Sequence, residues 1–357
     1  FTIRNLELLH SSNAGAKTLI DVIDKTSSPM GSRLMRRWLS LPLKNKEQIN
    51  ARYDIVDYFV NNNDLIYKFQ DAIRQVGDLE RLISKVSLLR VNPRELLQLA
   101  RALDQIEIIK NLCADSNDDS IKLYAEQLNV CDSIRQKIKR VLNPDSPALL
   151  SKGNFINDGV DEELDDLRAL SRSGKEYLTS IQRREIEATG ISSLKVGFNN
   201  VFGYYLEVTN LHKDKVPAEW IRKQTLANAE RYITEELKEY EQKILGADEK
   251  IHAIEERLYF ELINACGEFV APIQLDASLI SKIDCLVSFA DVALRNNYVK
   301  PTIDDSYVID IKEGRHPVIE QMMPIGEQYI SNDVYLDRER QQIIIITGPN
   351  MSGKSAL

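Results

Sequence analysis

The sequence predicts a mainly α, multi-domain fold. It consists of a helical core, a pair of long antiparallel coiled-coil arm helices with a small β-rich module at their tip, and the first strands of an α/β domain. Three observations predict this fold. Apolar residues recur at spacings of three and four through most of the first 150 residues, strict heptads follow Leu237, and residues 343–346 form an unbroken aliphatic run.

Length and composition limit the classes of protein. The chain has 357 residues, which is enough for two or three domains, and its net charge of −8 disfavours a generally basic, histone-like protein. No apolar run approaches the ~20 residues that cross a bilayer, so we expect a soluble, cytoplasmic protein without a membrane partner. The chain opens at Phe1 without an initiator Met or a signal peptide, so we expect an internal fragment.

Cysteine and histidine usage argues against several kinds of site. The four cysteines and four histidines are scattered and form no paired motif, which disfavours a disulfide framework, a zinc site and a histidine-based triad.

The helical core is predicted from amphipathic segments such as residues 31–41 and 49–60. In the first of them, Arg33, Arg36 and Arg37 alternate with Leu and Trp. We interpret these arginines as the solvent-exposed face of an amphipathic helix. The alternative interpretation, a phosphate-binding cluster, is less favoured.

The arm is predicted from its heptads. Apolar residues keep a 3-4-3-4 spacing from Leu237 to Leu258, and a helix over 233–263 is roughly 45 Å long, too long for the interior of one compact domain. Leu164, Leu167 and Ile181 fit the same register upstream, which predicts an antiparallel partner helix.

The tip module lies between the arm helices. Two β-branched and aromatic runs flank Asn199 and Asn200, as in a β-hairpin. Residues 190–232 carry six basic and four acidic side chains, a net +2 in an acidic chain. From charge alone, a solvated surface and a nucleic-acid contact both stay open, the former being favoured.

A phosphate-binding motif follows the aliphatic run. Residues 348–355 satisfy G-x-x-x-x-G-K-[ST] directly after a predicted buried strand. The glycines let backbone N–H groups face phosphate oxygens, Lys354 adds charge toward the β and γ phosphates, and Ser355 is the candidate Mg²⁺ ligand. Only Ala356 and Leu357 follow, so we expect no ATP hydrolysis by this chain alone. The candidate nucleotide-binding residues are Gly348, Pro349, Asn350, Met351, Ser352, Gly353, Lys354 and Ser355.

The assembled motifs resemble those of the MutS family of DNA mismatch repair proteins, the bacterial branch in particular. The resemblance extends from one end of the chain to the other, through residues 4–8, 30–39, 78–81, 194–198, 202–208, 224–233, 314–317 and 347–351. It implies an ATP-dependent, mismatch-recognising sliding clamp: two subunits enclose duplex DNA, a DNA-dependent ATPase with ATP and Mg²⁺ controls opening, and a MutL-type repair protein is a partner. It also implies a nucleoid-associated location.

The same resemblance implies roles for individual residues. Tyr329 matches an aromatic position that stacks on adenine, with an ordinary core Tyr as the alternative. The tip is then expected to be a clamp that grips the DNA backbone. The family's clamp residues match this sequence by motif only over residues 224–228. The candidate DNA contacts of the tip are Lys195, Asn199, Asn200, Lys213, Arg222, Lys223, Gln224 and Asn228.

With the resemblance, the predicted domain organisation has six parts. They are a helical core (1–160), an ascending lever helix (161–189), a β-rich clamp (190–232), a descending lever helix (233–265), a helical core return (266–300) and the start of a P-loop ATPase domain (301–357). In that family a mismatch-reading domain with a Phe-x-Glu wedge would precede Phe1, and its presence there stays open. Two alternatives stay open: a binding-only DNA tether, and a relative that handles branched DNA without mismatch recognition.

Overall fold

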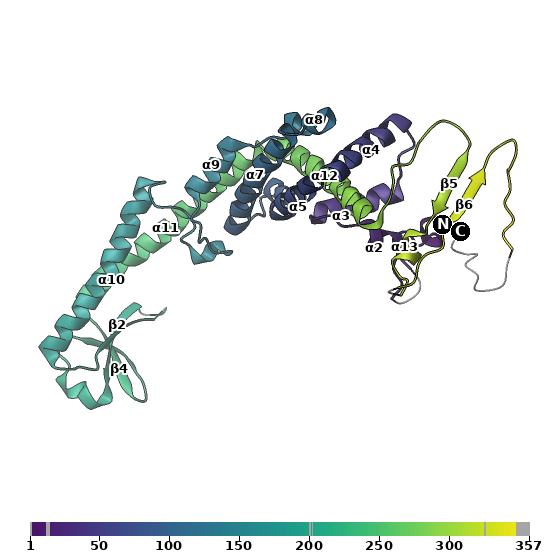
Figure 1. Ribbon diagram of the computed structural model, residues 1–357. Coiled ribbons are helices and arrows are strands. Elements are labelled where there is room, and N and C mark those ends of the chain that lie inside the picture. Colours follow the sequence, from purple (N-terminus) through teal and green to yellow (C-terminus); the bar gives the residue numbers. More distant parts are fainter. Residues whose placement is uncertain (1, 12–14, 200, 202, 325, 348–357) are drawn as a thin grey trace. The chain divides into compact units, whose positions relative to one another are not determined.

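The computed structural model describes residues 2–11, 15–199, 201, 203–324 and 326–347. It is mainly helical with small antiparallel sheets, as the sequence predicts (Figure 1). The chain divides into two compact units. Unit 1 comprises Phe1–Arg90, Gln98–Arg135 and Gly267–Leu357, and unit 2 comprises Val91–Leu97 and Gln136–Cys266. The six-part division stays a prediction, since these two units do not test it.

The helices are α1 (Thr2–Asn5), α2 (Leu19–Ile23), α3 (Pro29–Ser40), α4 (Lys46–Asn61), α5 (Asn63–Val76), α6 (Leu79–Ser87), α7 (Pro93–Ala114), α8 (Asp119–Gln127), α9 (Asp132–Val141), α10 (Glu162–Thr189), α11 (Glu235–Gly267), α12 (Val270–Asn296) and α13 (Pro317–Glu320), with 3-10 turns at Leu150–Lys152 and Asn210–Lys215. The strands are β1 (Lys195–Asn199), β2 (Gly203–Thr209), β3 (Ile221–Thr225), β4 (Ala229–Ile233), β5 (Ile309–Gly314) and β6 (Asn332–Leu336).

Helix α12 is the centre of unit 1. It packs against α3, α4, α5 and α6, and Figure 1 shows α3, α4 and α5 beside it. Residues on all of its sides are buried, among them Ile280, Cys285 and Leu286. A helix that is apolar on every side is stable only when neighbours cover it, and the amphipathic helices of the core supply that cover.

A buried carboxylate of α12 holds the start of α3. Asp284 accepts hydrogen bonds from the backbone N–H groups of Ser27 (2.8 Å) and Ser28 (2.9 Å) and from the Ser28 hydroxyl (2.7 Å). Burial raises the pKa of Asp284, and these donors oppose that rise. A Cβ on Gly31 would lie 2.1 Å from Asp284 Oδ2, so only glycine lets α3 approach this closely.

The arginines of α3 lie on its exposed side, as predicted. Arg33 Nη2 lies 2.8 Å from Asp78 and 2.6 Å from Glu80, while Met30 and Met35 of the same helix are buried.

Unit 2 contains two long helices that run antiparallel (Figure 1). Ser171 of α10 donates to Asp248 of α11 at 3.0 Å, and six residues further along α10 the Tyr177 ring packs on Tyr240. Helix α11 occupies the predicted segment as 33 continuous residues. The described heptad positions of α11 from Leu237 to Leu258 are buried or half-buried. Coiled-coil packing in detail stays a prediction.

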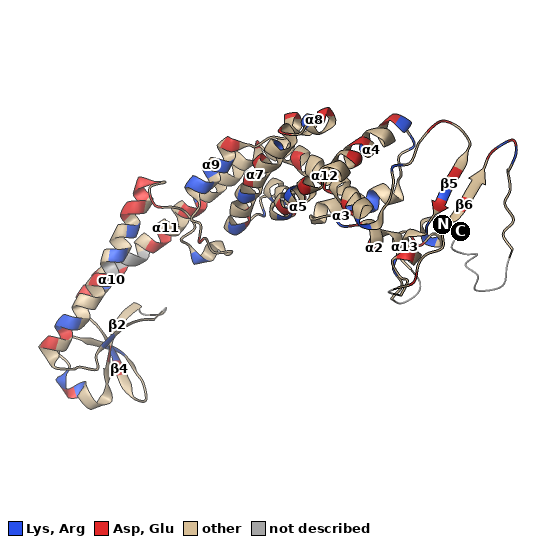
Figure 2. Ribbon diagram, in the orientation of Figure 1, with Lys and Arg blue, Asp and Glu red and all other residues tan. Residues whose placement is uncertain are grey.

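Figure 2 shows acidic residues at the beginning of α10. Glu162, Glu163 and Asp165 occupy its first turn, and Asp161 caps it by accepting the Leu164 N–H at 3.0 Å. Negative charge at this end complements the helix dipole.

The C-terminal region differs from the prediction. Strand β5 pairs antiparallel with β6. Residues 343–346, predicted to be a buried strand, have no regular structure, and Ile343 and Ile345 are 79% and 83% exposed. A buried strand needs neighbouring strands and covering helices, and the described part of the chain places none against this run.

No helix within the described residues is both long and apolar enough to cross a membrane.

Candidate nucleic-acid interface

The tip module is a four-stranded antiparallel sheet of order β1-β2-β4-β3. One face packs on the arm: Leu206, Val208 and Tyr232 cluster with Ile181 of α10 and Leu237 of α11. Residues alternate between the two faces of a strand, so the neighbours of these apolar residues lie on the other face.

That second face carries a polar row across all four strands. Lys195 lies opposite Glu207, Glu207 opposite Arg231, and Arg231 opposite Gln224. The Arg231 guanidinium donates to Glu207 at 2.8 Å and to Gln224 at 2.9 Å. We call Lys195, Glu207, Arg231 and Gln224 the polar row.

An aromatic ring supports the polar row. The Arg231 guanidinium carbon lies 4.3 Å from the centroid of the Tyr205 ring. A Cβ on Gly197 would lie 2.6 Å from the same ring, so the Gly197 backbone is in close contact with Tyr205. Arg231 is therefore held in one orientation by a ring and two side-chain acceptors.

The predicted DNA contacts do not form one surface. Lys195 and Gln224 belong to the polar row, whereas Arg222 lies opposite Tyr232, on the side of the sheet that packs on the arm. A register shift between Arg222 and Gln224 separates them, and the exposed Lys223 lies at that shift. The register shift interrupts the alternation of residues between the two faces of β3, so the sequence of this strand alone does not predict where the shift lies.

Arg222 is paired with an acid. It lies 3.2 Å from Glu230, which also accepts a hydrogen bond from the Tyr232 hydroxyl. That bond lowers the pKa of Glu230, and burial followed by this contact raises the pKa of Tyr232 to about 12. Arg222 is thus paired with an acid, as Arg231 is with Glu207, and it differs from Arg231 in lying outside the polar row.

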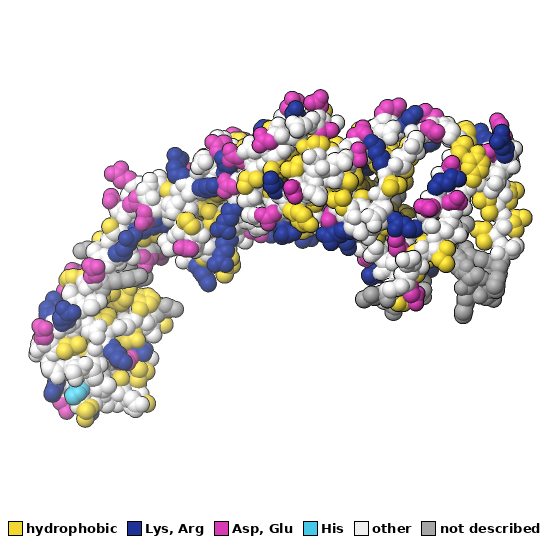
Figure 3. Space-filling view, in the orientation of Figure 1, with side chains coloured by type: hydrophobic (Ala, Val, Ile, Leu, Met, Phe, Trp, Pro, Cys, Tyr) yellow, Lys and Arg dark blue, Asp and Glu magenta, His cyan; other side chains and the backbone are white. Residues whose placement is uncertain are grey.

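The remaining predicted tip residues lie at turns. Lys213 is exposed in the 3-10 turn Asn210–Lys215, and Asn228 is exposed between β3 and β4. Asn199 accepts the Val201 N–H at 2.8 Å and so stabilises the hairpin turn. Asn200 lies outside the described residues. Figure 3 shows the basic side chains of the tip in separate groups, with apolar and acidic side chains between them.

Arg231 was not among the candidate DNA contacts predicted from the sequence. This residue was counted in the tip charge and included in a matching motif, yet the pairing of β2 with β4 is what places it beside Glu207. Residues 229–233 give no clear alternation, because Arg231 stands between Glu230 and Tyr232.

The nucleotide-binding prediction falls largely outside the structure. Gly348, Pro349, Asn350, Met351, Ser352, Gly353, Lys354 and Ser355 all lie outside the described residues. Tyr329 is half-buried in a segment without regular structure. The structure therefore leaves the phosphate loop and Tyr329's role as predictions.

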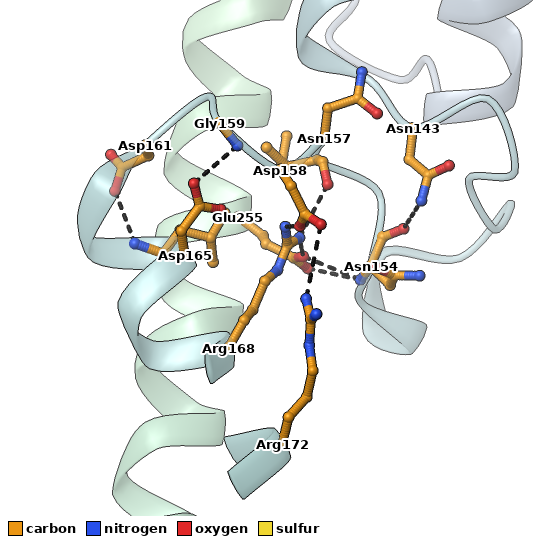
Figure 4. A network of polar contacts seen from close by, with 12 residues as sticks. Asn143, Asn154, Asn157, Asp158, Gly159, Asp161, Asp165, Arg168, Arg172 and Glu255 are labelled. Carbon is orange, nitrogen blue, oxygen red and sulfur yellow. Dashed lines mark hydrogen bonds and ion pairs between the residues drawn. The ribbon is translucent and has the colours of Figure 1, made fainter. Parts of the chain in front are cut away.

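A polar network joins the two arm helices that carry the sheet (Figure 4). Arg168 of α10 lies 2.5 Å from Glu255 of α11, whose side chain is fully buried. Arg168 also donates to Asp158 (2.8 Å) and to the Ile156 carbonyl (3.0 Å), and Glu255 accepts the Asn154 N–H at 2.9 Å. This network ties both helices to the loop before α10, and the sequence analysis did not predict it.

The fold and the candidate interface define a class of protein: a mainly helical, multi-domain protein that carries a small sheet on a two-helix arm. Comparison with known proteins gives the family. A profile of MutS domain III matches residues 1–290, and the chain belongs to the MutS family.

Individual relatives agree with this family. Over all 357 residues the chain is 59% identical to the DNA mismatch repair protein MutS of Flavobacterium johnsoniae, 58% to that of Bacteroides fragilis and 53% to that of Porphyromonas gingivalis. The chain covers 41%, 41% and 40% of these relatives, respectively. It thus spans about two-fifths of their length.

Proposed function

We propose that the protein acts in DNA mismatch repair and that its tip sheet contacts the DNA backbone. The names of the three relatives support mismatch repair and favour it over the branched-DNA and binding-only alternatives. The single structural observation that supports a DNA contact is the polar row, since it lies on the face of the sheet opposite the apolar cluster.

The chemistry of this face suits phosphate more than bases. Lys195 and Lys223 are exposed, and Arg231 is oriented by Tyr205, Glu207 and Gln224. Ammonium, guanidinium and amide groups donate hydrogen bonds to phosphate oxygens without reading sequence. We infer a backbone contact by Lys195, Lys223, Gln224 and Arg231, with Lys213 and Asn228 at the turns, and a smaller role for Arg222.

The remaining functions are proposed for the whole protein. They are ATP and Mg²⁺ binding by residues 348–355 with adenine on Tyr329, DNA-dependent ATP hydrolysis, clamp opening and sliding, a homodimer, and contact with a MutL-type partner in the cytoplasm. Their support is the phosphate-loop pattern and membership of the family. A Lys354→Ala whole protein should lose binding of a fluorescent ATP analogue.

The DNA contact is tested by salt dependence. Each neutralised phosphate contributes a slope of about −0.9 to the logarithm of affinity against the logarithm of salt. Removing two contacts with Lys195→Ala and Lys223→Ala together should reduce the magnitude of that slope by about two, measured by fluorescence anisotropy on labelled duplex DNA. The control is Lys122→Ala, a half-buried lysine of α8 that is paired with Asp119 and lies outside the tip. An unchanged slope in the double variant excludes the lysines as DNA contacts.

A further inference from the structure

Unit 1 contains a pocket of about 470 Å³ between α3, α4, α12 and residues 298–301. Its walls are mostly apolar and include Trp38, Val56, Phe289 and Val292. The rings of Trp38 and Phe289 stack with centroids 6.3 Å apart. This volume lies within the range of roughly 300–1,000 Å³ that is usual for small-molecule sites.

Two cations line this apolar pocket, Arg52 and Lys300, and Lys300 is paired with Asp54. The Arg52 guanidinium carbon lies 3.6 Å from the centroid of the Trp38 ring. Burial lowers the pKa of Arg52, and the groups among the described residues that oppose this fall are Tyr124 and Cys285, neither of which is a carboxylate. Within the described part of the chain, no hydrogen bond or ion pair to Arg52 is found.

The nearby charged groups do not satisfy Arg52. Asp54, two residues along α4, accepts a hydrogen bond from Lys300 at 2.7 Å. Asp57 also lines the pocket but is exposed and does not affect the pKa of Arg52. By contrast, the more exposed Arg33 of α3 is bound by both Asp78 and Glu80.

The donors of Arg52 are accessible to a ligand in the pocket. A guanidinium has five N–H donors, and no Arg52 nitrogen is among the fully buried polar atoms without a partner within the described residues. The stacked Trp38 ring supplies attraction on one face of the cation and no hydrogen-bond acceptor.

We propose that this pocket binds a small amphipathic anion. Its carboxylate, sulfonate or phosphate group pairs with Arg52, and its aromatic or aliphatic body lies against Trp38 and Phe289. The anion supplies the acceptors that Arg52 lacks, while the apolar walls select a ligand with a hydrophobic body. This site is independent of the proposed DNA contact, which lies in unit 2.

The test uses 8-anilinonaphthalene-1-sulfonate as the probe and the 357-residue chain with Trp220→Phe, which leaves Trp38 as the single tryptophan. Titration should give saturable binding to one site with quenching of Trp38 emission. Octanoate should displace the probe, and 1-octanol at equal concentration should not. Arg52→Met should weaken probe binding at least tenfold, whereas Arg36→Met, an exposed arginine of α3, should leave it unchanged.

A second variant tests the proposal if Arg52→Met fails to fold. Val56→Phe keeps Arg52 and fills the pocket, so it too should abolish quenching of Trp38, with circular dichroism confirming the helical content of each variant. Unchanged probe affinity in a folded Arg52→Met chain overturns the proposal. Non-saturable binding, or displacement by octanol as effective as that by octanoate, overturns it as well.

Discussion

Arg168 on α10 and Glu255 on α11 form an ion pair at 2.5 Å in which the Glu255 side chain has no exposed surface and that of Arg168 is 9% exposed. The spacing of apolar residues along α11 gives no hint of it, because Glu255 directly follows the heptad residue Ile254. A buried charge of this kind is stable only while its partner and the remaining hydrogen bonds are in place.

Breaking this pair should destabilise unit 2 strongly. Arg168→Met leaves the Glu255 carboxylate buried without its counter-ion, and the expected loss is about 3–5 kcal/mol of unfolding free energy. Urea unfolding followed by circular dichroism measures it. Arg172→Met is the control, since its side chain is 71% exposed and its nearest Asp158 oxygen is 3.7 Å away, and it should change stability by less than about 1 kcal/mol.

The double variant Arg168→Met with Glu255→Met separates the pair from its surroundings. Replacing both charges by apolar side chains removes the uncompensated carboxylate, so much of the loss should be recovered. If the double variant is as unstable as the sum of the two single variants, the ion pair is not the source of the effect.

Gly31→Ala should destabilise the core although alanine favours helices. Alanine usually stabilises a helix by about 1 kcal/mol relative to glycine. Here the new Cβ would lie 2.1 Å from the Asp284 carboxylate, which three donors hold in place, so thermal unfolding should occur at lower temperature. Gly246→Ala on α11 is the control, because nothing lies within 4 Å of its Cβ position, and it should be neutral or stabilising.

Asp276 should make stability depend on pH in a defined direction. It is fully buried on α12, accepts the Asn129 N–H at 2.9 Å, and has its other oxygen unpaired within the described residues. Burial raises its pKa from 3.8 to about 6, against the effects of Asn129 and Lys110. Cys131 also faces it, and burial followed by Asp276 raises the pKa of that thiol.

The folded state therefore binds the proton of Asp276 more tightly than the unfolded state does. Its stabilising contribution is complete below about pH 4 and is lost as the pH rises through about 6, by roughly 3 kcal/mol. In urea unfolding at a series of pH values, the unfolding free energy of Asp276→Asn minus that of the unaltered chain should rise over this interval. Asp119→Asn, whose side chain is 99% exposed, should show no such rise. A flat difference for Asp276→Asn contradicts the assignment.

Glu207→Gln should strengthen DNA binding if the polar row contacts phosphate. The Glu207 carboxylate lies 2.8 Å from Arg231 and cancels part of its charge. Its removal should raise affinity for duplex DNA and increase the magnitude of the salt slope by about one. Glu249→Gln, an exposed acid on α11, serves as the control. If Glu207→Gln instead binds DNA more weakly, the main role of Glu207 is to orient Arg231.

The sequence by itself determined the helices of the core, the two arm helices and the first hairpin of the tip. These elements follow from the periodicity of apolar residues and from local turn chemistry, as in the heptads from Leu237 and the turn after Asn199. The phosphate-loop pattern is local in the same way.

Only the tertiary structure decided which charged residues act together. The order β1-β2-β4-β3 and the register shift in β3 place Arg231 beside Glu207 and separate Gln224 from Arg222. The antiparallel arrangement of α10 and α11 buries Glu255 against Arg168 across 87 residues of sequence. Residues 343–346 look like a buried strand in sequence and yet lie exposed without regular structure. The physical reason is that strand pairing, register and charge burial depend on contacts between distant segments, and the periodicity of one segment contains no information about its partner.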